Sequence, residues 1–146
     1  MEKYMKKSCL TTKEIENVLK NRGIQATAQR IAVCKYVLCE AEHVTVDQVK
    51  EWADLNFPKI SLATVYNTMN ILVEAKLIDA LKLPHSEKVI YDNNTEKHHH
   101  FLDEKTGKLY DISISDVEVK NNLPKDYEVK GFSVLLTGNF NSEVKS

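Results

Sequence analysis

Residues 92–111 read DNNTEKHHHFLDEKTGKLYD, and three of these residues are consecutive histidines. The stretch contains five potential metal ligands: Asp92, His98, His99, His100 and Asp111. In an extended segment, side chains alternate between two faces, so we expect His98 and His100 on one face and His99 on the other. Imidazole and carboxylate donors without a thiolate suit Fe(II), Mn(II), Zn(II) or Ni(II). The spacing predicts a metal site, and the alternative is a solvated polar loop.

Upstream of this stretch, the sequence predicts four helices. Capping boxes at Thr11 and Thr45 and single caps at Thr27 and Ser61 mark where the helices begin. Apolar residues follow each cap at helical spacing. The expected helices cover residues 12–22, 27–40, 45–56 and a fourth segment that begins after Ser61.

Two short strands follow the fourth helix. Residues 77–83 and 88–91 have β patterning and flank a turn that contains Pro84, so they predict a hairpin. Four helices followed by a hairpin are typical of a winged-helix domain, in which the last helix before the hairpin enters the major groove of DNA. Any small helical domain that ends in a hairpin would give the same pattern. The DNA-contacting residues expected on the fourth helix are Ser61, Ala63, Thr64, Tyr66, Asn67 and Asn70.

Beyond the ligand-rich stretch, the pattern predicts a small second domain. We expect a second hairpin from residues 98–102 and 108–112, a short helix at 115–121 and a strand near 127–137. This unit is too small for a large core of its own, so burial of one face against a second copy predicts a homodimer. The fold class is therefore α+β, with a winged-helix DNA-binding domain at 1–91 and an α/β dimerisation and metal-sensing domain at 92–146.

Composition limits the class of protein. With 146 residues, 42% of them apolar, and no apolar run of membrane-spanning length, the chain is expected to be globular and cytoplasmic, with no membrane partner. Residues 1–83 carry a net charge of +2 and the remainder −3, which permits DNA binding by the first half. The three cysteines form no C-x-x-C pair, and their odd number argues against a disulfide framework. Cys34 and Cys39 are interpreted as apolar helix residues.

Taken together, the Ser61–Asn67 helix, the ligands between Asp92 and Asp111, and His43 before the third helix resemble the ferric uptake regulator family, most closely its peroxide-responsive PerR branch. The resemblance implies an N-terminal winged helix that binds DNA and a C-terminal domain that dimerises. It also implies one regulatory Fe(II) or Mn(II) per subunit, and an A/T-rich inverted-repeat operator on double-stranded DNA. The ligand set implied by the matching motifs is His43, Asp92, His98, His100 and Asp111.

Three further features bear on function through the same resemblance. Family members commonly carry C-x-x-C pairs for a structural zinc, but the positions of the first pair fall on Asp103 and Thr106 here, so a structural four-cysteine zinc site is not expected. Aspartate at position 111 accompanies peroxide-sensing members, whereas iron-sensing members usually have glutamate. In peroxide sensing, the histidine implied to be oxidised is His43 or His98.

Three other functions compete with a peroxide-sensing repressor. An iron, manganese or zinc uptake regulator would use the same ligands to read metal availability. A non-haem iron oxygenase also uses histidine and carboxylate ligands, but it needs a substrate pocket for which a winged-helix chain has little room. The last alternative is a winged-helix module that does not respond to metal.

Overall fold

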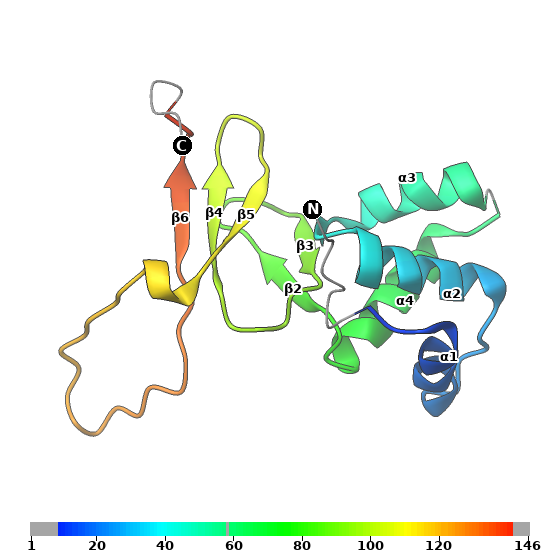
Figure 1. Ribbon diagram of the computed structural model, residues 1–146, viewed down its shortest axis with the longest axis horizontal. Helices are drawn as coiled ribbons and strands as arrows, with labels where there is room; N and C mark the ends of the chain where they lie inside the picture. Colours follow the sequence, from blue (N-terminus) through cyan, green and yellow to red (C-terminus); the bar gives the residue numbers. More distant parts are fainter. Residues whose placement is uncertain (1–8, 58, 142–146) are drawn as a thin grey trace. The chain divides into compact units, whose positions relative to one another are not determined.

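The computed structural model describes residues 9–57 and 59–141. The chain divides into two compact units, residues 1–95 and 96–146. The helices of the first unit are α1 (Thr12–Asn21), α2 (Ala28–Lys35), the π-helix η1 (Tyr36–Glu40), α3 (Val46–Asn56) and α4 (Leu62–Glu74). The mixture of helices and small sheets is the predicted α+β fold (Figure 1).

The helices begin where the caps predict. Thr11 and Thr45 each accept a hydrogen bond from the backbone N–H three residues on, and Glu14 and Gln48 bond back to the cap residues, which completes two capping boxes. Gly23 ends α1 with a φ of 69°, a left-handed conformation that glycine adopts without steric cost. Hydrogen bonds from cap side chains therefore determine where helices of the first unit begin, and Gly23 determines where α1 ends.

The first sheet has the strand order β1-β3-β2 and consists of β1 (His43–Val44), β2 (Asp79–Lys82) and β3 (Val89–Asp92). β2 and β3 form the predicted hairpin, and β1 adds a short antiparallel strand on the other side of β3. The core of this unit lies among the helices. Its fully buried side chains include Leu19, Leu38, Val49, Val65, Met69 and Leu72.

The second unit contains β4 (His99–Asp103), β5 (Leu109–Ile112), the 3-10 helix η2 (Ile114–Asp116) and β6 (Leu135–Gly138), with the strand order β5-β4-β6. β4 and β5 form the predicted second hairpin, while β6 runs parallel to β4. A long connection without regular structure joins η2 to β6 and loops away from the sheet (Figure 1).

Two expectations about the second unit are wrong. The helix expected at 115–121 is a single 3-10 turn that ends at Asp116, and the strand expected near 127–137 is reduced to Leu135–Gly138. Residues 117–133 are mostly exposed, so the apolar spacing that suggested these elements has no core of this chain to pack against. Apolar periodicity forms an element only where a surface is available to bury it.

The expectation about the cysteines is also wrong. Cys9 and Cys39, separated by 30 positions in the sequence, are joined by a disulfide bond. Cys34 is a free, buried thiol, as expected for an apolar helix residue. Within the described residues, none of the helices is both long enough and apolar enough to cross a membrane.

Candidate metal centre and nucleic-acid interface

Three of the predicted ligands converge within the second unit. His98 precedes β4, His100 lies on β4, and Asp111 is paired with His100 across the β4–β5 ladder. The Nε2 atoms of the two histidines are 2.9 Å apart, and they lie 3.3 Å (His98) and 3.7 Å (His100) from Oδ1 of Asp111. Alternation along an extended segment thus places both imidazoles on the side of the carboxylate.

These separations fit a common metal ion. Metal–nitrogen and metal–oxygen bonds of about 2.1 Å at roughly right angles place neighbouring ligand atoms about 3 Å apart. The Nδ1 atom of His98 lies 2.5 Å from the backbone carbonyl oxygen of Glu96. If Nδ1 carries the proton and donates it to that carbonyl, Nε2 keeps its lone pair for a metal. The donor set suits Fe(II), Mn(II) or Zn(II).

His99 points away from these ligands, as the alternation predicts. Its side chain is fully buried, its ring centroid lies 5.5 Å from that of Phe132, and its Nδ1 accepts a hydrogen bond of 3.2 Å from the backbone N–H of Val134. His99 is therefore a core residue that connects β4 to the segment before β6.

The other two predicted ligands meet within the first unit. His43 on β1 is paired with Asp92 on β3, and Nε2 of His43 lies 3.3 Å from Oδ2 of Asp92. The other carboxylate oxygen of Asp92 accepts a 2.9 Å hydrogen bond from the backbone N–H of Asn94. Asp92 is almost completely buried, and a buried carboxylate needs opposite charge or hydrogen bonds to offset its lost hydration.

Asn93 is a buried polar residue that sequence reasoning missed. Its side-chain amide donates to the backbone carbonyls of Val37 (2.9 Å), Leu38 (3.3 Å) and Ala41, at the end of η1. These bonds attach the residue after Asp92 to the helix end that leads to His43. No local pattern signals this contact, because its partners are more than fifty positions away in the sequence.

The predicted DNA-reading face lies on α4. Ser61 caps the helix by accepting the backbone N–H of Thr64, and the two hydroxyls lie 2.9 Å apart. Ala63, Tyr66, Asn67 and Asn70 are exposed, whereas the opposite face buries Val65, Thr68, Met69 and Leu72. The helix therefore keeps the polar groups of Tyr66, Asn67 and Asn70 available for base edges and phosphates.

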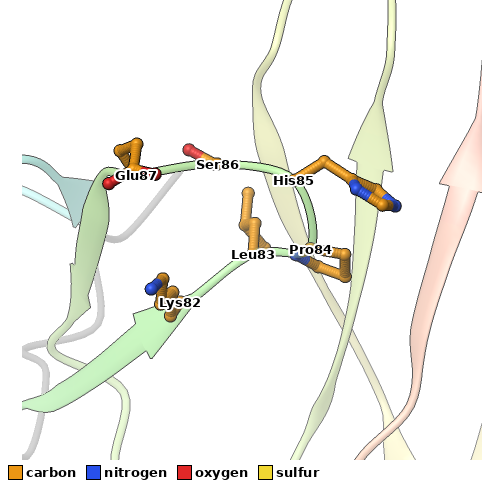
Figure 2. A pocket seen from close by; sticks show the side chains of 6 residues that line it. All are labelled: Lys82, Leu83, Pro84, His85, Ser86 and Glu87. Atoms are coloured by element: carbon orange, nitrogen blue, oxygen red, sulfur yellow. The ribbon is translucent and has the colours of Figure 1, made fainter.

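The β2–β3 hairpin is the wing of the winged-helix unit, and the turn between the two strands forms its tip. Its residues, Lys82 to Glu87, line a shallow open hollow of about 640 Å³. Figure 2 shows the His85 side chain pointing away from those of Lys82 and Glu87. His85 has a φ of 62°, in the left-handed region that few non-glycine residues adopt. The conformation of the turn thus directs an imidazole outward from the wing.

A small cleft lies between the β2–β3 hairpin, the start of α3 and α4. It has a volume of about 160 Å³ and is lined by Thr45, Val46, Asp47, Tyr66, Glu87, Lys88, Val89 and Tyr91. Burial, and then the neighbouring Tyr66, raises the pKa of the Tyr91 hydroxyl. Tyr91 is the residue before Asp92 and pairs with Val44, so it lies beside both ligands of the first unit. Tyr66 thus lies on α4 and also lines a cleft with Tyr91, the residue before Asp92.

Asp103 at the end of β4 and Thr106 in the turn that follows are the positions where the family resemblance implies a cysteine pair. The Thr106 hydroxyl donates to Oδ2 of Asp103 at 2.8 Å, and the backbone N–H of Lys105 donates to Oδ1 at 3.0 Å. Asp103 is buried, and the backbone N–H of Gly107 bonds its carbonyl. Side-chain hydrogen bonds close this turn.

Comparisons with known proteins agree with this architecture. The model of the ferric uptake regulator family matches residues 21–137. The peroxide-responsive repressor PerR of Staphylococcus epidermidis is 30% identical over 114 residues, which cover 76% of this chain and 75% of that protein. The crystal structure of the Campylobacter jejuni peroxide stress regulator has 28% identity and a TM-score of 0.60, covering 88% of this chain and 97% of that one. The Helicobacter pylori ferric uptake regulator Fur shares the fold, with a TM-score of 0.69 at 14% identity over 92% of this chain and 94% of that one.

Fold, donor sets and reading helix together define a winged-helix regulator with a second, β-rich unit. The chain belongs to the ferric uptake regulator family. It is therefore a metal-dependent transcriptional regulator and not an enzyme, so the oxygenase alternative is wrong. Regulators of this family bind DNA and act as dimers.

Proposed function

We propose that this chain is a repressor that senses peroxide through a regulatory Fe(II), with Mn(II) as the non-responsive alternative metal. The proposed ligands are His43, Asp92, His98, His100 and Asp111. The observation that carries the proposal is the convergence of two imidazoles and the Asp111 carboxylate at distances of 2.9–3.7 Å. The likeness to peroxide-responsive repressors supports it.

The ligand set explains how metal could control DNA binding. His43 and Asp92 belong to the winged-helix unit, and the other three ligands belong to the second unit. A metal bound by all five would favour one relative orientation of the units, so its binding free energy would become an orientation preference. In a dimer, that preference would set the spacing of two α4 helices on an inverted repeat.

The proposed response to peroxide is oxidation of a ligand. Fe(II), if held by these five donors, would supply one electron to split peroxide, and the imidazole that is oxidised would supply the other. We propose that His43 or His98 gains one oxygen atom. An oxidised imidazole is a poor donor, so the remaining ligands hold metal weakly and the orientation preference is lost. The cysteines are not required for this response.

The dimer is proposed to form through the second unit. Several large apolar side chains there are 42–62% exposed in the single chain, namely Ile114, Val119, Leu123, Tyr127, Val129, Phe132, Leu136 and Phe140. An exposed apolar surface of this kind is typical of a protein–protein interface. The partner DNA is proposed to be an A/T-rich inverted repeat, and the location cytoplasmic.

DNA binding with and without metal tests the proposal. Mn(II) or Fe(II) should raise the affinity of the wild-type protein for its operator, and His98→Ala should abolish that gain. The control is His85→Ala, because His85 is exposed whereas His99 is buried. This variant should keep the gain in operator affinity that metal causes. If metal raises the operator affinity of His98→Ala as much as that of the wild type, His98 is not a ligand of the regulatory metal.

The same assay separates peroxide sensing from metal-uptake regulation. If peroxide releases the Fe(II) form from DNA and leaves the Mn(II) form bound, the sensing proposal holds. If both forms respond only to metal concentration, the chain is an iron, manganese or zinc uptake regulator.

A further inference from the structure

The proposed metal chemistry does not use the two cysteines that the fold brings together. Cys9 lies just before the N-cap of α1, and Cys39 lies in η1, at the end of the helical segment that begins with α2. The two residues are bonded through their sulfur atoms. Both side chains are half-buried, so each is partly accessible to solvent.

The bond closes a segment that contains all of α1 and α2. Within that segment, Ile15, Leu19 and Val33 are buried in the core of the winged-helix unit. The bond therefore attaches the start of the described chain to the same helix end that the Asn93 amide holds through backbone carbonyls. His43 follows Cys39 by four positions.

Cys34 provides an internal comparison. It lies five positions before Cys39 in the same helical segment, is fully buried, and has no disulfide partner. Burial raises the pKa of its thiol to about 12. A buried thiol that is not ionised near neutral pH reacts slowly with oxidants. The fold therefore separates one inert cysteine from two that are accessible and paired.

The redox conditions in the cell determine whether Cys9 and Cys39 are bonded or reduced. A regulator that binds DNA works where cellular thiols are kept reduced, and disulfides there are usually transient and redox-sensing. We propose that Cys9 and Cys39 form a reversible, oxidant-responsive disulfide, which is a second modification site that needs no metal and stabilises the winged-helix unit.

The chemistry requires one molecule of peroxide. One thiolate attacks the O–O bond, which forms a sulfenic acid and releases the first water after proton transfer. The second thiol attacks the sulfenic sulfur, forms the S–S bond and releases the second water. Two thiols lose two electrons and two protons, and peroxide is reduced to two waters. A cellular dithiol reverses the bond by thiol–disulfide exchange.

Stabilisation follows because a closed loop of about 30 residues loses conformational freedom in the unfolded chain. For a unit of this size, the melting temperature should rise on the order of 10 °C on oxidation. The oxidised and reduced forms should share the winged-helix fold, since the bond joins ends that the helices already bring together.

The experiment uses the full chain, reduced with dithiothreitol, freed of metal with a chelator and then treated with hydrogen peroxide. Without metal, the histidine oxidation proposed above cannot contribute, so this test is independent of it. Peptide mass spectrometry without reduction should find a Cys9–Cys39 cross-link that lacks two hydrogens. The melting temperature should rise, and dithiothreitol should reverse both changes.

Three single variants complete the test. Cys34→Ser should keep the cross-link and the rise in melting temperature, while Cys9→Ser and Cys39→Ser should each lose both. The circular dichroism spectrum of each variant is compared with that of the reduced wild type, which identifies a variant that fails to fold. If Cys39→Ser does not fold, Cys9→Ser alone tests whether the cross-link and the rise in melting temperature are lost. Two unmodified thiols at Cys9 and Cys39 after peroxide, a cross-link through Cys34, or a cross-link that leaves the melting temperature unchanged each overturns the proposal.

Discussion

At the residue scale, the most informative side chains are polar and buried. Asp92 and Asn93 are adjacent, and they make different contacts: the carboxylate faces His43, and the amide donates to the end of η1. Buried polar groups are costly unless satisfied, so each of these contacts restricts the local structure. Together they hold His43 and Asp92 in a fixed relation before any metal binds.

Asn93→Ala should therefore destabilise the winged-helix unit and weaken metal binding. The substitution removes the hydrogen bonds from the buried amide to the carbonyls at the end of η1, which costs about 1–3 kcal/mol of unfolding free energy. Chemical denaturation and metal titration measure the two effects. Asn70→Ala, at an exposed position on α4, is the control. Stability equal to that of the wild type would show that the amide does not support the site.

At the element scale, α4 combines three functions along one helix. Ser61 caps it, its buried face joins the core, and its exposed face carries Tyr66 and Asn67. Tyr66 also lines the cleft shared with Tyr91. Such a helix can read DNA only if its position in the unit is rigid, which the buried residues Val65 and Met69 provide.

Asn67→Ala should weaken operator binding by roughly tenfold to a hundredfold, because one base contact is worth about 1–3 kcal/mol. Tyr66→Ala should also weaken operator binding, because it removes a contact to the DNA backbone. Metal uptake should be unchanged. Fluorescence anisotropy with operator DNA and a parallel metal titration measure both properties. Asn17→Ala, exposed on α1, should bind DNA normally. Loss of DNA and metal binding together would indicate misfolding rather than lost contacts.

Elements with a local chemical cause could be predicted from the sequence. The caps at Thr11, Thr27, Thr45 and Ser61 and the two hairpins depend on residues within a few positions of each other. The period-two alternation correctly separated His99 from its neighbours. The pairing of segments that are distant in the sequence was not predicted.

The missed features are tertiary contacts. β1 forms only because β3 offers it an edge, β6 pairs in parallel with β4 across a long connection, and Cys9 meets Cys39 through the packing of α1 and α2. The expected helix at 115–121 failed for the related reason that its apolar residues are exposed in this chain. The spacing of apolar residues in a sequence does not identify the surface against which those residues pack.

At the scale of the whole molecule, a dimer of this chain would form without a four-cysteine zinc site in each subunit, since the chain has three cysteines. The turn at Asp103 and Thr106 is closed by hydrogen bonds, and the apolar side chains of the second unit offer contact area. Side-chain packing would then hold the two subunits together.

Chelators should therefore remove the regulatory metal without dissociating the dimer. Sedimentation velocity of the protein before and after chelation measures this directly, and DNA binding should fall while the sedimentation coefficient stays that of a dimer. Phe132→Glu, in the exposed apolar set, should produce monomers with or without metal. Monomers of the wild type after chelation would instead indicate a metal that supports the interface.

The measurement that tests the central claim most directly is tryptic mass spectrometry of the Fe(II)-loaded protein after release from operator DNA by peroxide. We expect one added oxygen on His43 or His98, in proportion to the loss of DNA binding, and neither change in the Mn(II)-loaded protein. Asp111→Glu should keep metal-dependent DNA binding but reduce the oxidation, because the longer side chain changes the geometry at the metal. Added oxygen found on methionine or cysteine and never on His43 or His98 would contradict peroxide sensing through the ligands and leave metal availability as the signal that this regulator reads.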